Sequence, residues 1–132
     1  MKNEILGIHT SWKDCDHTTI MAVENGLPIG TVMIEYGGWE KRQAMIWNLC
    51  VDKGSRKKKI GTTLLRAAIE DATKQGASDV HLEWHAEDTE GWVLDWYKRQ
   101  GFFVDSIIGV KEKRHVVQMT LAGFAKKKGG SQ

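Results

Sequence analysis

Apolar and polar residues alternate in several short stretches of the chain, which is the pattern of strands with one buried face. The strands predicted in this way cover residues 4–10, 18–24, 29–36, 44–51, 79–85, 102–111 and 115–121. Asn25-Gly26 separates the second strand from the third and predicts a tight hairpin. The polar segment 11–17 is expected to form a loop. Strands two to four should therefore form an antiparallel meander.

Two other stretches repeat apolar residues every three or four positions, as amphipathic helices do. They predict helices over residues 60–75 and 91–100, which end at Gly76 and Gly101. A helix between two strands favours a right-handed crossover and parallel pairing of strands four and five. We therefore expect an α/β (α+β) fold, a single domain over residues 1–125 with a mixed, mostly antiparallel sheet of six or seven strands. Residues 126–132 are expected to be a disordered basic tail.

The junction between the fourth strand and the first long helix carries the strongest chemical signal. A short loop at Asp52 leads to four consecutive cations, Arg56 to Lys59, and the helix begins directly after them. Helix N-termini present N–H groups that have no partner within the helix, and they carry partial positive charge. Cations there oppose the dipole, so an anion such as a polyphosphate is expected in front of them. On charge alone, a solvated surface is the simpler interpretation.

The order of residues in this stretch resembles motif A of the GNAT superfamily of N-acetyltransferases. Leu49-Cys50-Val51 matches the end of the motif's strand, and R-K-K-K-I-G, residues 56–61, matches its loop R/Q-x-x-G-x-G/A. Lys59 stands where the family usually has its first glycine. Lysine at this position can still offer its N–H group if its backbone dihedrals are ordinary. A second signature of the family is similar to residues 96–102, where Trp96-Tyr97 and Gly101-Phe102 fall at the matching places.

The resemblance implies that the protein binds acetyl-CoA and transfers its acetyl group to a primary amine of a small molecule, peptide or protein. In the family, strands four and five splay apart around the pantetheine arm. The family's two helices after the first strand should be reduced or absent here, because only about ten residues are available for them. The implied cofactor-binding residues are Leu49, Cys50, Val51, Arg56, Lys57, Lys58, Lys59, Ile60, Gly61, Thr62 and Asp88, with Glu90 as the alternative to Asp88.

Tyr97 matches the tyrosine that related enzymes use as a general acid near the sulfur. Helical spacing alone favours a packed aromatic residue instead. The base is left open, with Glu83, His85 and Glu35 as candidates for the base or the acceptor site, Glu40 as a further candidate, and a water chain as the alternative. Of the six tryptophans, Trp47, Trp84 and Trp96 are expected in the core.

Composition narrows the possible ligands, locations and functions of the protein. A net charge of +2 over 132 residues is too close to neutral to indicate a nucleic-acid binder. The two cysteines have neither zinc-site nor disulfide spacing, so no metal is expected. No apolar run is long enough for a membrane span and no signal peptide is evident, which indicates a cytoplasmic protein. A non-catalytic CoA-binding regulator and a basic RNA-binding module are the alternative functions, and a homodimer is a further possibility.

Overall fold

The structure is a computed structural model that describes residues 3–12, 15–37, 43–85, 91–111 and 114–120. The expected tail therefore lies outside the described residues, as do Trp39, Glu40, Asp88 and Glu90. The strands are β1 (Asn3–Trp12), β2 (Cys15–Glu24), β3 (Leu27–Tyr36), β4 (Gln43–Val51), β5 (Asp79–His85), β6 (Phe103–Lys111) and β7 (Arg114–Thr120). The helices are a 3-10 helix, η1 (Lys53–Lys58), and two α-helices, α1 (Ile60–Lys74) and α2 (Gly91–Arg99).

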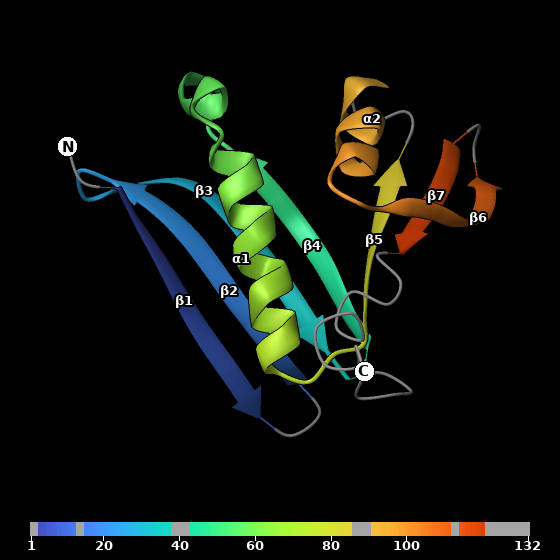
Figure 1. Cartoon of the computed structure of the whole chain (residues 1–132), viewed down its shortest axis with the longest axis horizontal. Coiled ribbons are helices and arrows are strands. Elements are labelled where there is room, and N and C mark those ends of the chain that lie inside the picture. The colour runs from blue at the N-terminus through green and yellow to red at the C-terminus, as the bar shows by residue number, and fades with distance from the viewer. Residues whose placement is uncertain (1–2, 13–14, 38–42, 86–90, 112–113, 121–132) are drawn as a thin grey trace.

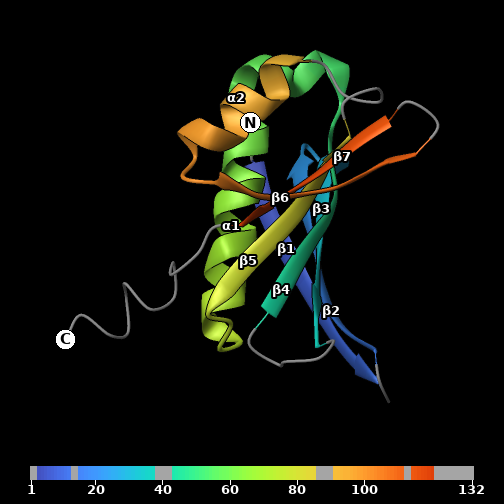
Figure 2. The same ribbon diagram turned by 90° about the vertical axis from the view of Figure 1, so that its right-hand side faces the viewer.

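The described strands form one sheet in the order β1-β2-β3-β4-β5-β7-β6. Neighbouring strands are antiparallel except β4 and β5, which are parallel and are connected through η1 and α1. Figure 1 shows α1 lying across the strands of the N-terminal half, with α2 beside the far end of β5, and Figure 2 shows both helices on one side of the sheet. The expectation of a mixed, mostly antiparallel sheet with one β-α-β unit is confirmed.

The loop predicted over residues 11–17 is wrong, because β1 and β2 continue as a paired ribbon to Trp12 and Cys15. Polar side chains satisfy one another across this ribbon. His9 lies 2.8 Å from the Thr18 hydroxyl through Nδ1 and 2.7 Å from Asp16 through Nε2. Cross-strand pairs of this kind stabilise a polar edge hairpin that lacks an apolar alternation. Only residues 13–14 separate the two strands, so no helix fits between them, as expected.

The core lies between the sheet and α1. Leu64, Leu65 and Ala68 of the helix are fully buried against apolar side chains of the central strands, such as Ile34 and Ile46. The helix approaches β3 most closely at Gly30, where an added Cβ would lie 2.8 Å from Leu64 Cδ1 and 3.1 Å from the Cys50 carbonyl oxygen. This close packing holds the start of α1 beside the end of β4.

The turns follow the sequence signals. Asn25 and Gly26 both have positive φ, 52° and 80°, as the two central residues of a type I′ hairpin require. Gly76, with φ of 88°, ends α1 just after its C-cap, where the Ala77 N–H donates to the Ala72 carbonyl at 2.9 Å. The predicted hairpin turn at Asn25-Gly26 and the predicted end of the long helix at Gly76 are therefore confirmed.

Candidate active site

A bulge in β4 sets the direction of the residues at the end of that strand. Trp47 pairs with Met33 and Cys50 pairs with Thr31, so β4 carries one more residue than β3 between these pairs. Asn48 takes up the extra residue with a left-handed φ of 52°. Because of this extra residue, Leu49 and Val51 pack against the core on the α1 side of the sheet.

Strands β4 and β5 separate directly before the bulge. Their parallel pairing runs from Gln43–Asp79 to Ile46–Leu82 and goes no further. Figure 1 shows the two strands diverging between α1 and α2. Among the described strands none pairs with the β5 side of β4 beyond Ile46, so that edge offers backbone N–H and C=O groups to another extended chain. The splayed strands expected from the family resemblance are present.

The turn from β4 into α1 is built by η1 and Lys59. Asp52 begins η1 and accepts a hydrogen bond from the Gly54 N–H at 3.2 Å, while its own N–H donates to the Ile29 carbonyl at 2.8 Å. Lys59 lies between the two helices with φ of 59° and ψ of 27°. The backbone dihedrals of Lys59 are therefore not the ordinary ones under which a lysine was expected to replace the glycine without cost. A Cβ is disfavoured in this left-handed region, which glycine adopts without that cost.

The first turn of α1 has the properties of an anion site. No side chain caps it, and it contains no acidic residue. The Thr63 N–H donates to the Lys59 carbonyl at 3.1 Å, so intrahelical hydrogen bonding begins only at Thr63. The preceding N–H groups, of Ile60, Gly61 and Thr62, belong to the unpaired donors of the helix terminus. They supply partial positive charge toward whatever lies in front of the helix.

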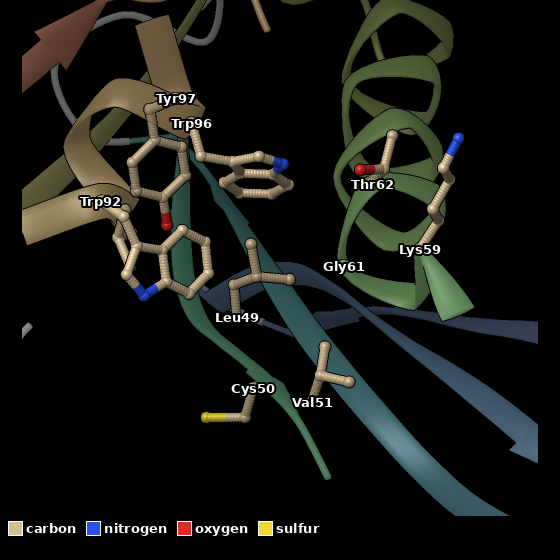
Figure 3. Close-up of a pocket in the computed structure, with 10 residues that line it drawn as sticks. Leu49, Cys50, Val51, Lys59, Gly61, Thr62, Trp92, Trp96 and Tyr97 are labelled. Carbon is tan, nitrogen blue, oxygen red and sulfur yellow. The ribbon is translucent and has the colours of Figure 1, made fainter. Parts of the chain in front are cut away.

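A pocket of about 430 Å³ lies between the end of β4, the start of α1 and α2 (Figure 3). Its lining residues are Leu49, Cys50, Val51, Lys59, Gly61, Thr62, Trp92, Val93, Trp96 and Tyr97. Figure 3 shows the side chains of Leu49 and Val51 directed toward Trp96 and Gly61, whereas the exposed Cys50 thiol is directed away from them. One narrow space thus joins the bare edge of β4 to the unpaired amides of α1.

Tyr97 is both packed and directed into this pocket. Its ring lies 5.1 Å from that of Trp96 and 5.8 Å from that of Phe102, measured between centroids. Figure 3 shows the hydroxyl directed toward Leu49 and Trp92. Burial raises the pKa of Tyr97 above its ordinary value, and the nearby Cys50 adds a smaller rise. The phenol therefore stays protonated at neutral pH and can donate a proton.

Seven residues predicted for the site line the pocket together: Leu49, Cys50, Val51, Lys59, Gly61, Thr62 and Tyr97. The side chain of Ile60 lies in the core instead, so only its backbone faces the site. Arg56, Lys57 and Lys58 form the last part of η1, and their side chains lie outside the described part of the chain. Asp88 and its alternative Glu90 lie outside the described residues.

Sequence analysis missed Trp92, Val93 and Trp96 as pocket residues. Trp96 was expected in the core, yet it is only half-buried, and Trp92 is 53% exposed. Their helical spacing could have indicated this, because Trp92, Val93 and Trp96 share one face of α2 with Tyr97. The apolar face of α2 is thus divided between the core and the pocket.

The described candidate bases, Glu35 and Glu83, lie on the other side of the sheet. Glu35 is exposed, and its Oε1 accepts a hydrogen bond of 3.0 Å from the Trp47 indole N–H. Glu83 is half-buried on β5, while the side chain of His85 and the whole of Glu40 lie outside the described part. The expectation that Trp47 belongs to the core is wrong, since it is 37% exposed. Residues 44 and 46 take the buried positions of β4, so alternation directs Trp47 away from α1.

Comparison with known proteins identifies the family. The model of the Acetyltransferase (GNAT) family matches residues 2–102. The chain belongs to the GNAT family of acetyltransferases. The uncharacterized N-acetyltransferase MJ1207 of Methanocaldococcus jannaschii is 40% identical in an 83-residue alignment that covers 59% of this chain and 35% of that protein. The matched region thus spans about a third of that GNAT relative.

Solved structures show the same fold. A GNAT-family protein from Desulfovibrio desulfuricans superimposes with a TM-score of 0.75 at 14% identity, over 80% of this chain and 68% of the other. An aminoglycoside 6'-N-acetyltransferase in complex with coenzyme A gives a TM-score of 0.70 at 13% identity, over 79% and 71% of the two chains. These likenesses establish that the GNAT chain has the GNAT fold.

Two further properties concern the described part of the GNAT chain. It contains no helix that is both long and apolar enough to cross a membrane. It also contains no group of three or more histidine, cysteine, aspartate or glutamate side chains arranged to hold a metal ion.

Proposed function

We propose that this GNAT chain binds acetyl-CoA in the pocket between β4, α1 and α2 and transfers the acetyl group to a primary amine. The observation that carries the proposal is the junction of two features in one pocket. One is the stretch of β4 at Leu49 and Cys50, which lies beyond the last pair with β5, and the other is the uncapped first turn of α1. An extended pantetheine arm needs the first feature and a pyrophosphate needs the second.

The phosphate end of the cofactor is assigned to the turn from η1 to α1. The amides of Ile60, Gly61 and Thr62 would donate hydrogen bonds to the pyrophosphate, and the cations of residues 56–59 add positive charge around it. Gly61 has no side chain, and its ideal Cβ position lies 3.7 Å from Val51 Cγ2 and 3.8 Å from the Trp96 ring. The absence of a side chain there leaves room where the pocket passes between α1 and Trp96.

Acetyl-CoA supplies an acetyl group that is activated as a thioester. The chain's contribution is to position the two reactants and to move protons. The attacking amine forms a C–N bond with the acetyl carbon, the C–S bond breaks, and its electron pair stays on sulfur. Tyr97 is assigned as the acid that protonates this thiolate, because its hydroxyl faces the pocket and its raised pKa keeps the proton in place beforehand. Solvent then returns a proton to Tyr97.

The proton that the amine loses needs an acceptor. Glu83 directly follows Leu82, the last residue of β5 that pairs with β4. Glu35 lies on β3 opposite Met45, and His85 follows on the same strand as Glu83. All three remain candidates, with water as the alternative.

A release assay tests the proposed activity. Purified protein is incubated with acetyl-CoA and a panel of amines, polyamines, aminoglycosides and peptide N-termini, and free CoA thiol is measured. We expect amine-dependent release that stops when the pocket is altered by Tyr97→Ala. A folded protein that binds acetyl-CoA and yet releases no CoA with any amine would instead be a non-catalytic CoA-binding regulator.

A further inference from the structure

Trp47 occupies a distinctive place beside the proposed reaction site. It is the first residue of β4 after the last pair with β5, so it stands where the two strands begin to separate. Its indole N–H is held by the Glu35 carboxylate on the adjacent strand, and much of its side chain is accessible to solvent. This hydrogen bond favours one orientation of the exposed indole ring.

No helix of the described part of the chain covers the sheet face around Trp47, on which Glu35 and Trp47 are exposed. Alternation places Met33, Glu35, Met45, Trp47, His81 and Glu83 on the side opposite α1, because their neighbours Ile34, Ile46 and Leu82 are buried beneath the helix. Figure 2 shows α1 and α2 on the other side of the sheet, and no helix in the described part of the chain covers this one. The α1 side is closed by the core, so an acceptor has access to the reaction site from the face opposite α1.

The charge of the sheet selects the kind of acceptor. Strands β1 to β5 contain glutamate and aspartate residues and no lysine or arginine. The cations next to β4 in the sequence are Lys41 and Arg42, which lie outside the described residues, and Lys53 and residues 56–59 in the turn that leads into α1. On the face opposite α1, Glu35 and Glu83 lie on the strands that flank β4, so Trp47 stands between two acidic strands. This face is electrostatically complementary to a cation.

We propose that the acceptor is an aliphatic amine with a second positive charge, a diamine or polyamine, and that it lies against Trp47 on the face opposite α1. This inference rests on the proposed acetyl transfer. The exposed indole attracts an ammonium group by a cation–π interaction, Glu83 adds opposite charge, and Met33 and Met45 contact the methylene chain. Glu35 is a positioning residue that orients the indole. One amine of the acceptor reacts while the other is held by this surface.

Matched acceptors test the proposal. The probes are 1,4-diaminobutane and butylamine, which differ by one amino group, with saturating acetyl-CoA. We expect kcat/KM for the diamine to exceed that for the monoamine by about tenfold or more, and we expect added salt to reduce the difference. Equal values for the two amines, no transfer to the diamine, or transfer only to peptide N-termini would overturn the proposal. A thermal shift with acetyl-CoA alone shows separately whether the proposed cofactor site exists.

Variants locate the recognition surface. Trp47→Ala should raise KM for the diamine about tenfold and leave KM for acetyl-CoA unchanged, whereas Trp47→Phe, which keeps an aromatic face, should have a smaller effect. The matched control is Ile8→Ala, an exposed apolar residue of β1 that alternation places on the same face, two strands beyond β3. A normal diamine KM in Trp47→Ala would overturn the proposal, because it would show that the indole does not contact the acceptor.

Two substitutions of Glu35 separate orientation from charge. Glu35→Gln keeps an oxygen that accepts the indole hydrogen bond, whereas Glu35→Ala removes it. If Glu35 acts by orienting Trp47, Glu35→Ala should raise the diamine KM more than Glu35→Gln does, and kcat should change little in both. A large fall in kcat with KM unchanged in Glu35→Gln would overturn the positioning role and indicate a base.

Discussion

Lys59 holds a backbone conformation that suits glycine better than lysine. A residue with a Cβ loses on the order of 1–2 kcal/mol in the left-handed region, so glycine at position 59 should relieve that cost. Part of this stabilisation is offset because glycine is also freer in the unfolded chain. We therefore predict that Lys59→Gly raises the free energy of unfolding by about 1 kcal/mol, which corresponds to about 4 °C in Tm. Urea titration and thermal melts measure the change.

Lys74 provides the matched control for this prediction. It is an exposed lysine in the last turn of α1, where the backbone is right-handed. Lys74→Gly should lower the free energy of unfolding by up to about 1 kcal/mol, the usual helix penalty of glycine. The two substitutions should thus have opposite signs. A loss of stability in Lys59→Gly equal to that in Lys74→Gly would contradict the left-handed conformation at residue 59.

Tyr97 carries the proposed acid chemistry at the same scale. Tyr97→Phe keeps the ring contacts with Trp96 and Phe102 and removes only the hydroxyl. We predict a fall of about 10²–10⁴ in the rate of transfer, with acetyl-CoA affinity and Tm little changed, measured in single turnover with a slow acceptor. Because the pKa of Tyr97 is raised above 10.0, loss of its proton should not slow the wild-type enzyme below that pH. A variant as fast as wild type would leave Tyr97 with packing alone.

At the scale of elements, the site depends on how closely α1 approaches the sheet. Gly30→Ala places a methyl group 2.8 Å from Leu64 Cδ1 and 3.1 Å from the Cys50 carbonyl oxygen, and the second of these is backbone that cannot turn aside. We predict a loss of about 1–3 kcal/mol in the free energy of unfolding and weaker acetyl-CoA binding, because the helix start and the β4 edge are pushed apart. Thermal melts with and without acetyl-CoA measure both effects.

Gly7→Ala is the control for this packing argument. Its added Cβ would meet Ile20 Cγ1 at 3.8 Å, an ordinary contact, in a strand remote from the pocket. It should leave stability and acetyl-CoA binding close to wild type. If Gly30→Ala behaved in the same way, the close approach of α1 at Gly30 would not be what fixes the pocket.

The elements show which features alternation can predict. The regular strands, the Asn25-Gly26 hairpin and the ends of α1 follow from local signals, and the structure has them. Segment 11–17 was predicted as a loop because its residues are polar, but the pairing of His9 with Asp16 and Thr18 stabilises a strand there. The bulge at Asn48 was not predicted, because a single extra residue in one strand is defined only by the register of its partner.

At the scale of the whole molecule, the sequence predicted the pocket residues of β4 and α1 but, apart from Tyr97, not those of α2. The basic loop and the Leu49-Cys50-Val51 strand end are contiguous, so their adjacency to α1 could be predicted from the chain itself. Trp92 and Trp96 reach the pocket only because α2 packs beside α1 after a further strand. Trp47 was assigned to the core because an apolar ring was expected to be buried, whereas it is 37% exposed on a face that neither of the described α-helices covers.

The most direct test of the central claim is the melting temperature of the purified chain with and without acetyl-CoA. Binding at 100 times the dissociation constant stabilises a protein by about 2.7 kcal/mol, which for a domain of this size raises Tm by on the order of 10 °C. We predict a shift of that size, with a smaller shift for 3′,5′-ADP, which lacks the pantetheine arm that β4 is proposed to bind. A well-folded protein whose Tm does not move with millimolar acetyl-CoA would contradict the assignment of the pocket.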